Sequence, residues 1–433
     1  MKKLLTTIIL LVLMIIPTVY AKEITVYDNT ESSIMLDIAR RYYTVDEIKK
    51  YIDVLAQNEN SSLQLHMTDD ENVGIECRYL DQTKERATVS DGVYTNPDTG
   101  KKFLTYDQLT ELMNYAKSKN VEFIPEIDVP AHMKGFFDLA EIKFGYDFVH
   151  HPFDWDVWEN SGIGWGTGDE VGHIDLKAPN AKPFIKALYD EYTEFFKDCK
   201  YFFIGFDEYT FRPEMKIEYA NELYDYLSNK GFTVRMWSDA ITKDNISDLN
   251  NNIEIVYWAW KEADINLTNY ATVPDLQEKG FKVIITNKFY LFFVPAPDST
   301  TDEALSRTVS NIENYWELEK WNYNFEGGLT NHDNILGGMV CVWGEHSDGI
   351  SDSVIFNQTK NMYNAMFPKL DKIPRTIVIP DDPEPDTTPS QDEEEVKGDD
   401  TVNPKTNDNI YLYLITLMLS TLSLGVLLNV KLR

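Results

Sequence analysis

Two adjacent carboxylates, Asp207 and Glu208, stand directly after the apolar run Tyr201–Phe206. Such a run predicts a buried strand whose carboxyl end presents both acids to a cleft. Neighbouring carboxyl groups can divide the work of cleaving a glycosidic bond, because one can orient a group of the sugar while the other transfers the proton. Asp-Glu is also a common dipeptide in acidic proteins, so this pair alone leaves a purely structural role open.

The elements that must position these acids form a regular alternation of strand-like and amphipathic helical segments. The strand candidates are Ile34–Ile38, Ser62–Met67, Val121–Ile127, Tyr201–Phe206, Thr233–Trp237, Ile253–Trp258, Lys282–Thr286 and Leu336–Val342. The helix candidates between and after them include Val45–Gln57, Asp107–Lys119, Phe184–Lys197, Glu214–Lys230 and Ser353–Met366. Apolar strands alternating with helices predict an α/β fold with a parallel sheet, and eight repeats favour closure into a (β/α)8 TIM barrel. An open doubly wound sheet is the alternative, which the lack of a GxGxxG after the first strand disfavours.

Polar and aromatic side chains follow each predicted strand. In chain order they are Arg40, His66 and Asp69, Asp128 and His132, Asp207 and Glu208, Trp237 and Asp239, Trp258, Tyr290, and finally Trp343 and Glu345. In a TIM barrel these positions gather at the carboxyl ends of the strands, where such barrels carry their active sites. Each residue alone could be a strand-end ion pair, a structural histidine or a core tryptophan. Their joint placement predicts one functional rim.

Composition limits the classes of partner. The net charge of −31 argues against nucleic acid, which requires a basic surface. The aromatic fraction of 13%, with nine Trp and 25 Tyr, is typical of surfaces that stack on sugar rings, although most aromatic side chains lie in the core. Three cysteines exclude a full disulfide framework. The seven histidines show no metal-ligand spacing such as HExxH, so we predict neither a metal site nor a cofactor.

Five segments together resemble the motif blocks of glycoside hydrolase family 20, the β-N-acetylhexosaminidases. In order they are Met35-Leu-Asp-Ile-Ala-Arg-Arg, Leu65-His-Met-Thr-Asp-Asp, Ile124-Pro-Glu-Ile-Asp-Val-Pro-Ala-His, Ile204-Gly-Phe-Asp-Glu and Val342-Trp-Gly-Glu. The resemblance covers about Ile34 to Phe367 and implies the TIM barrel as the fold. It also implies a retaining reaction in which the acetamido oxygen of the substrate attacks the anomeric carbon, in place of a carboxylate nucleophile.

The resemblance implies a role for each candidate residue. Glu208 is the expected general acid/base, buried beside Asp207, which is expected to hold the acetamido N–H, and Tyr290 is expected to donate to the acetamido oxygen. The implied substrate-binding residues are Arg40 and Glu345 at the sugar hydroxyls, Trp237, Trp258 and Trp343 around the N-acetyl group and ring, and Asp69, His132 and Asp239 in the polar network. The implied substrate is a glycan that contains N-acetylglucosamine, with poly-β-1,6-N-acetylglucosamine of biofilm matrix as the first candidate. Host mucin or milk glycans and chitin-type glycans are alternatives.

One block departs from the family pattern His-x-Gly-Gly-Asp-Glu. Phe203 and Phe206 occupy the positions of the histidine and the second glycine. Strand alternation predicts that Phe203 shares a face with Asp207 while Phe206 points the other way. Loss of the histidine is expected to loosen the network behind the acids and so to reduce activity or alter specificity. A non-catalytic glycan-binding adhesin on the same barrel is therefore the alternative function.

The two ends of the chain predict export and anchoring. Residues 1–21 form a signal peptide, with Lys2 and Lys3 before an apolar run and Val19-Tyr20-Ala21 as the cleavage site. The catalytic barrel is assigned to 22–375. Residues 376–402 form an acidic, proline-rich stalk, which we expect to be disordered because its charges repel and it contains few apolar groups to bury.

Residues 403–433 resemble a sortase sorting signal. Asn403-Pro-Lys-Thr-Asn407 is followed by Ile410–Val430, 21 residues without a charge, and then by Lys431 and Arg433. A helix of that length spans about 31 Å, enough to cross a bilayer. The expected partners are sortase and peptidoglycan, or the membrane itself. The expected location is extracellular, at a Gram-positive type of cell surface.

Overall fold

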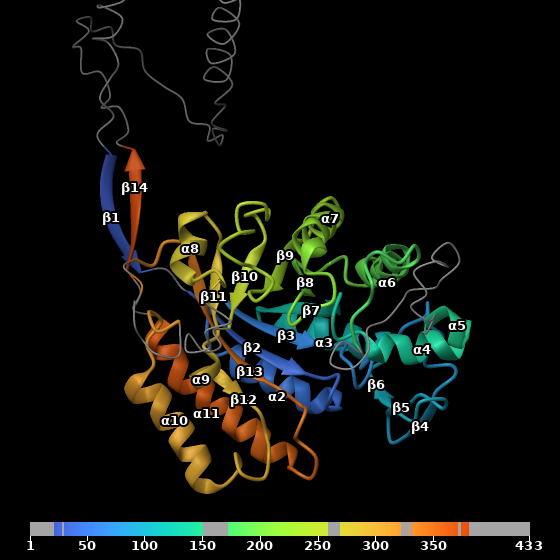
Figure 1. The fold of residues 1–433 in the computed structure, drawn as a ribbon. Coiled ribbons are helices and arrows are strands. Elements are labelled where there is room, and N and C mark those ends of the chain that lie inside the picture. The colour runs from blue at the N-terminus through green and yellow to red at the C-terminus, as the bar shows by residue number, and fades with distance from the viewer. Residues whose placement is uncertain are drawn as a thin grey trace, which may run out of the picture. The chain divides into compact units, whose positions relative to one another are not determined.

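A computed structural model describes residues 21–27, 30–149, 172–258, 269–321, 329, 331–370 and 374–380 (Figure 1). Its centre is a closed barrel of eight parallel strands. They are β2 (Glu31–Asp37), β3 (Ser61–His66), β7 (Val121–Val129), β8 (Tyr201–Gly205), β9 (Thr233–Trp237), β10 (Glu254–Tyr257), β11 (Val283–Ile285) and β13 (Ile335–Val342). The strands pair in the order β11-β10-β9-β8-β7-β3-β2-β13, and a further pairing of β11 with β13 closes the ring. Each predicted strand overlaps one of these, so the barrel prediction is confirmed.

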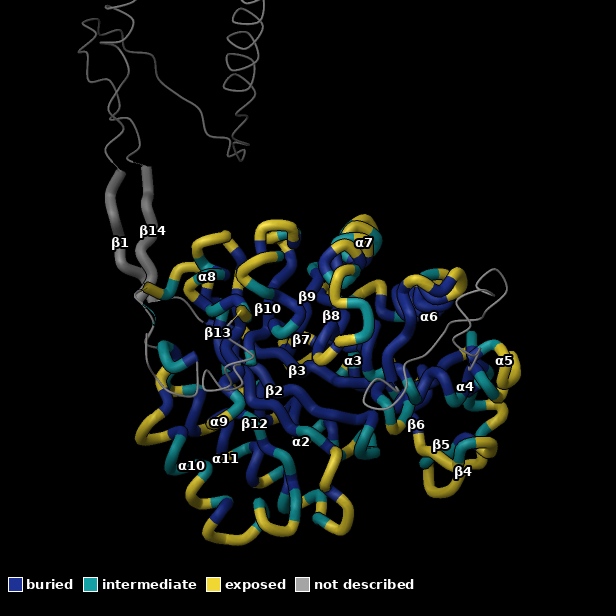
Figure 2. Tube along the Cα trace, in the orientation of Figure 1, coloured by how far each residue is buried: buried dark blue, intermediate teal, exposed yellow. Residues whose placement is uncertain are grey.

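Two apolar layers explain why these segments form strands. Within the barrel, alternate strand residues pack together in a cluster that includes Met35, Ile124, Phe203, Trp237 and Met339. Residues of the opposite parity point outward and pack under the helices in a larger cluster. Both faces of each strand are therefore buried, as Figure 2 shows, which is why the strands read as almost continuous apolar runs.

Helices cover the outside of the barrel. Their bounds are α2 (Val45–Leu55), α3 (Tyr106–Ser118), α4 (Lys134–Phe144), α5 (Tyr146–Val149), α6 (Ala181–Phe195), α7 (Lys216–Ser228), α8 (Val273–Glu278), α9 (Lys288–Leu291), α10 (Asp302–Tyr315) and α11 (Asp352–Leu370), with a 3-10 turn at Pro213–Met215. Capping boxes begin α2 at Thr44, α3 at Thr105 and α8 at Thr272. The alternation has one exception, because the described connection from β9 to β10 contains no helix.

The structure also contains short strands in addition to the eight of the barrel. After β3, the strands β4 (Thr88–Ser90), β5 (Val93–Thr95) and β6 (Lys102–Phe103) form a small antiparallel sheet, and β12 (Phe292–Phe293) adds to β13. The sequence patterns did not predict these pieces, because two or three residues are too few to show a period.

The ends of the body meet in a two-stranded ribbon. Strand β1 (Ala21–Tyr27) pairs antiparallel with β14 (Pro374–Pro380) along its whole length. Thus β14 includes the first residues of the segment assigned to the stalk. The rest of the stalk, the signal peptide up to residue 20 and the segment 403–433 lie outside the described residues. Among the residues that the structure does describe, no helix is both long and apolar enough to cross a bilayer.

A buried charge cluster lies in the barrel layer that contains the amino-terminal ends of the strands. The guanidinium of Arg235 donates to Glu31 at 2.7 and 2.8 Å and to Glu254 at 2.9 Å, and it stacks on Tyr201 at 3.9 Å. All of these side chains are buried. Such a cluster, at the end opposite to the predicted site, stabilises the barrel only while all its charges are paired.

Candidate active site at the carboxyl ends of the strands

The two acids that follow β8 adopt opposite exposures. The Asp207 side chain is only 12% exposed, whereas that of Glu208 is 59% exposed. The chain turns sharply here, since Gly205, Phe206 and Glu208 have φ angles of 75°, 73° and 53°. Residues other than glycine rarely adopt positive φ, and such strained backbone clusters at functional sites. The expectation of a buried proton donor was therefore wrong: the buried acid is Asp207.

Gly205 is required at this turn. A Cβ atom built on it would lie 1.6 Å from Oδ1 of Asp128, a buried residue of β7. That same oxygen accepts a hydrogen bond from the backbone N–H of Phe206 at 3.3 Å. The absence of a side chain thus lets Asp128 reach the backbone that carries the acids.

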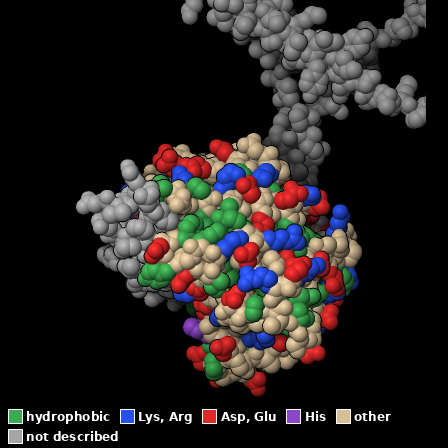
Figure 3. All heavy atoms as spheres, turned by 90° about the vertical axis from the view of Figure 1, so that its right-hand side faces the viewer, with side chains coloured by type: hydrophobic (Ala, Val, Ile, Leu, Met, Phe, Trp, Pro, Cys, Tyr) green, Lys and Arg blue, Asp and Glu red, His purple; other side chains and the backbone are tan. Residues whose placement is uncertain are grey.

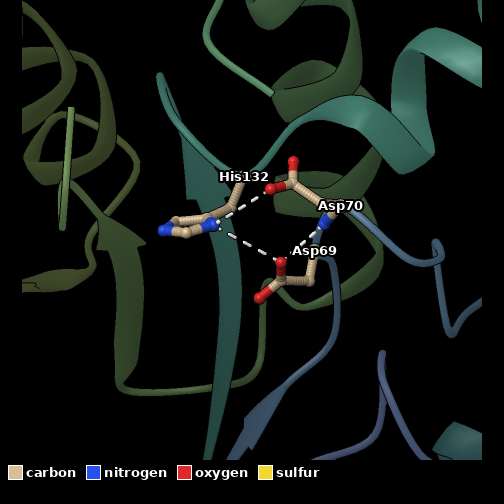
Figure 4. A group of neighbouring side chains, drawn as sticks. All are labelled: Asp69, Asp70 and His132. Atoms are coloured by element: carbon tan, nitrogen blue, oxygen red, sulfur yellow. Dashed lines mark hydrogen bonds and ion pairs between the residues drawn. The ribbon is translucent and has the colours of Figure 1, made fainter. Parts of the chain in front are cut away.

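His132 lies between two pairs of carboxylates, of which Figure 4 shows Asp69 and Asp70. Its Nδ1 is 3.4 Å from Asp69 and 3.5 Å from Asp70, and its Nε2 is 3.6 Å from Asp207 and 3.7 Å from Glu208. Burial lowers the pKa of His132, but the Asp69 and Asp207 carboxylates outweigh it and raise that pKa well above its ordinary value. The surrounding carboxylates thus favour the charged form of His132, which links the acid pair to the residues after β3.

Arg40 supplies the second cation of the rim. It lies 2.7 Å from Asp69, 3.2 Å from Asp37 and 3.1 Å from Glu71, and its guanidinium stands 5.5 Å from the ring centroid of Trp343. The structure thus brings the predicted residues Arg40, Asp69 and Trp343 together. Asp37 and Glu71 were missed, although Asp37 ends β2 next to the predicted rim.

Two groups of side chains have the types that ligate metals. In the groups Asp69–Asp70–His132 and Asp128–His132–Asp207, one ligand atom from each residue lies within 4.8 Å of the others. Arg40 already pairs with Asp69 at 2.7 Å, and both ring nitrogens of His132 lie 3.4–3.7 Å from carboxylates. The arrangement fits an ion-pair network better than a metal centre.

An aromatic wall stands beside the acids. Ring centroids are 5.8 Å apart between Trp237 and Trp343, 5.8 Å between Trp343 and Phe292, and 6.2 Å between Phe292 and Trp258. The wall joins the three predicted tryptophans and adds Phe292, which the sequence analysis missed. Flat rings of this kind can enclose an acetamide methyl group and the apolar face of a sugar.

The phenylalanines that replace the family histidine and glycine take the predicted faces. Phe203 lies within the barrel, 4.9 Å from Trp237, whereas Phe206 packs outward, 6.2 Å from Tyr219. The charge network behind the acids is present with Phe203 in place, because His66 and His132 both contact Asp69. The structure therefore gives no support to a loosened network.

Tyr290 and Glu345 follow the strands β11 and β13 in the chain. Tyr290 is buried on α9, where its ring meets that of Phe289 edge-on at 4.9 Å. Glu345 is exposed after β13. Lys288 lies on the same helix as Tyr290, and its ammonium is 5.2 Å from the centroid of the Trp258 ring. Burial lowers the pKa of Lys288 against the opposing effects of Glu208 and Glu345, which places both acids near this lysine.

Asp239 supports the turn that carries Glu208. Its carboxylate accepts a hydrogen bond from the backbone N–H of Glu208 at 2.5 Å and another from Nε1 of Trp258 at 3.2 Å. Burial and the nearby Asp207 raise the pKa of Asp239 to about 7. Asp239 thus positions both the backbone of Glu208 and the indole of Trp258.

The raised pKa of Asp239 predicts how stability depends on pH. An unfolded aspartate has a pKa of about 3.9. Between that value and about 7 the native protein holds the extra proton, so Asp239 makes the free energy of unfolding fall as pH rises through this window. His132 acts with the same sign, because its contribution is present below about pH 6.5 and is lost as pH rises through its raised native pKa.

We expect Asp239→Asn to flatten this slope, since asparagine keeps an acceptor for Glu208 but does not titrate. Urea unfolding at several pH values from 4.5 to 8 measures the free energy of unfolding of both proteins. The free energy of unfolding of the variant, relative to that of the wild type, should increase as pH rises. Parallel curves would contradict the assignment of the proton to Asp239.

Comparisons with known proteins agree with this geometry. The family model described as glycosyl hydrolase family 20, catalytic domain, matches residues 32–358. The crystal structure of dispersin B aligns over 79% of this chain and 99% of its own, with 32% identity and a TM-score of 0.71. Among curated relatives, a beta-hexosaminidase of Emericella nidulans is 21% identical over 75% of this chain, and beta-hexosaminidase subunit B1 of Dictyostelium discoideum is 23% identical over 80%. The chain spans 57% and 59% of the lengths of these two relatives. With the family model matching three quarters of its length, the chain belongs to glycosyl hydrolase family 20.

Proposed function

We propose that the protein is a retaining β-N-acetylhexosaminidase that cleaves β-linked N-acetylglucosamine by substrate-assisted catalysis. One observation carries the proposal: a buried aspartate and an exposed glutamate stand side by side, linked through His132, next to an aromatic wall. Membership of family 20 and the beta-hexosaminidases among its relatives support the same activity.

The exposures of the two acids fit two different tasks. Glu208 is open enough to reach the glycosidic oxygen, which it protonates as the bond to the anomeric carbon breaks; it later takes a proton from the attacking water. Oδ1 of Asp207 is buried and accepts no hydrogen bond from the described residues. In the proposed mechanism this oxygen accepts the acetamido N–H of the substrate, while Tyr290 donates to the acetamido oxygen. The acetamido oxygen then attacks the anomeric carbon and forms an oxazolinium intermediate.

Orientation is the larger contribution to this mechanism. Correct placement of an intramolecular nucleophile contributes roughly 7–11 kcal/mol. General acid catalysis contributes a factor of about 10² to 10⁴, or roughly 3–5 kcal/mol. The walls that hold the acetamido group therefore matter as much as the proton donor. Trp343 has a second use here, because its buried Nε1–H has no acceptor among the described residues and can donate to a sugar hydroxyl.

The proposed substrate is poly-β-1,6-N-acetylglucosamine outside the cell. The alignment with dispersin B over nearly all of that protein supports this choice within the family. Export and anchoring through the two terminal segments would place the enzyme at the cell surface, covalently on peptidoglycan after sortase cleavage or held in the membrane. Acidic and basic side chains are interspersed on the face seen in Figure 3, but the net charge of the whole chain is −31, which disfavours a polyanionic substrate.

A host glycan is the second candidate substrate. A lacto-N-biosidase of Bifidobacterium bifidum is 23% identical over 62% of this chain, although the match covers only 22% of that protein. The chemistry would be the same, and only the groups beyond the terminal sugar would differ. The choice therefore depends on residues around the rim rather than on Asp207 and Glu208.

An assay with the purified chain tests these proposals in two stages. The p-nitrophenyl glycoside of N-acetylglucosamine should be hydrolysed, and that of glucose should react at least about 10³-fold more slowly, because glucose has no acetamido nucleophile. Poly-β-1,6-N-acetylglucosamine, chitobiose and lacto-N-tetraose, followed by mass analysis of products, then identify the linkage. Glycan binding without turnover of any of these compounds would favour the adhesin and overturn the enzyme.

A further inference from the structure

A layer of buried polar side chains lies directly beneath the rim. Glu126 of β7 is fully buried, and the strand register places it beside His66 of β3 and Phe203 of β8. Its Oε1 accepts a hydrogen bond from Nε1 of Trp237 at 2.8 Å, and its Oε2 accepts one from the Gln64 amide at 2.7 Å. The tryptophan that begins the aromatic wall is thus tied to a carboxylate in the barrel interior.

The same carboxylate also holds the charge network. Nδ1 of His66 lies 3.0 Å from Oε1 of Glu126, as an ion pair, and Nε2 of His66 lies 2.7 Å from Asp69. Asp69 in turn contacts Arg40 at 2.7 Å and His132 at 3.4 Å. A continuous series of ionic contacts therefore connects Glu126 to His132, which faces the acid pair.

We propose that Glu126 is a positioning residue for the reaction, which sets the indole of Trp237 and the His66–Asp69–His132 network in one fixed geometry. Because one oxygen of Glu126 serves both partners, the pocket wall and the acid pair cannot shift independently. The inference rests on the proposed function, since it assigns a role within that reaction. Neither Glu126 nor His66 is expected to touch the substrate.

The charge of Glu126, and not only its shape, matters in this scheme. Both nitrogens of His66 lie within 3.0 Å of carboxylate oxygens, which favours the imidazolium over the neutral ring. Burial lowers the pKa of His66, but Glu126 and Asp69 together raise it well above its ordinary value. Asp128 and Asp207 face the same region, as their own pKa values respond to His66. Removing the charge of Glu126 should allow His66 to lose its proton at lower pH.

The test is Glu126→Gln, which keeps the size and the hydrogen-bonding capacity of the side chain but removes its charge. We expect kcat/KM on the p-nitrophenyl glycoside of N-acetylglucosamine to fall roughly 10- to 100-fold, the effect of losing one buried charge-assisted contact. The alkaline limit of the pH profile should also move to lower pH. A merely structural role would lower the amount of folded protein without moving the profile.

Glu31→Gln is the matched control. It neutralises another buried glutamate of the same barrel, beside Arg235 at the opposite end of the strands. This control should lower the thermal midpoint of unfolding while leaving kcat/KM within about twofold and the pH profile in place. Both variants are compared by thermal unfolding monitored by circular dichroism, so that loss of folded protein is separated from loss of activity.

Trp237→Phe tests the hydrogen bond between Trp237 and Glu126, and it remains available as a test if Glu126→Gln does not fold. It removes only the indole N–H donor and part of the ring, so kcat/KM should fall several-fold with an unchanged pH profile, because His66 keeps its countercharge. In the double variant the two losses should be less than additive. Wild-type values for kcat/KM and pH profile in Glu126→Gln, or for kcat/KM in Trp237→Phe, would overturn the inference. An inactive wild type would instead overturn the proposed function.

Discussion

Glu208→Gln is expected to lower kcat on an unactivated N-acetylglucosamine disaccharide by about 10² to 10⁴, the usual contribution of a general acid/base. Glutamine preserves the shape of the side chain but can neither donate the proton to the leaving oxygen nor accept one from water. The Glu208 side chain is exposed, so the free energy of unfolding should change by no more than about 0.5 kcal/mol. The loss is then chemical and not structural.

A comparison of substrates with different leaving groups shows which step of the reaction the variant has lost. A p-nitrophenolate leaves without protonation, so formation of the oxazolinium should be nearly normal in Glu208→Gln with the aryl substrate. Hydrolysis of the oxazolinium should be slow, because the variant has no base to activate water. A strong anionic nucleophile such as azide needs no base and should restore turnover. A variant that loses activity equally on both substrates and is not rescued would show that Glu208 has another role.

Asp207→Asn is expected to lower kcat/KM by about 10²- to 10³-fold on both substrates. The variant keeps an oxygen that can accept the acetamido N–H but loses the negative charge that stabilises the positive charge growing on that group, an electrostatic effect of this size. His132 would also lose one of its four carboxylate neighbours while keeping Asp69. The fall should therefore be independent of the leaving group, in contrast to that of Glu208→Gln.

Steady-state kinetics of both variants on the same two substrates make the comparison. A thiazoline that mimics the oxazolinium should bind Glu208→Gln almost as tightly as wild type and Asp207→Asn much more weakly. Calorimetric titration measures both affinities directly. Equal binding by the two variants would remove the distinction between the orienting acid and the proton-transferring acid.

The barrel and most of its rim could be predicted from the sequence, because both follow from short-range patterns. Strands buried on both faces appear as apolar runs, and the residues that follow them must gather at one end of a parallel barrel. This reasoning found Arg40, His132, the Asp207–Glu208 pair and the tryptophans. It did not require knowledge of which side chain touches which.

Of the layer beneath the rim, this reasoning found His66, Asp128 and Trp237 but not Glu126. Glu126 and Asp128 alternate on β7 and therefore share its inner face, which was a usable signal. Their partners, His66 and Trp237, come from other strands, and their contacts depend on barrel register. The exposures of the two acids were missed for a related reason, since they depend on the positive φ angles after β8 and not on residue type.

The close approach of Asp128 to Gly205 has an evolutionary consequence. The two positions are far apart in sequence, yet the space for a single carbon atom is shared between them. Any lineage that gains a side chain at the glycine must first shorten or displace the aspartate. Across many descendants of this barrel, the residues at these two positions should therefore change together or not at all.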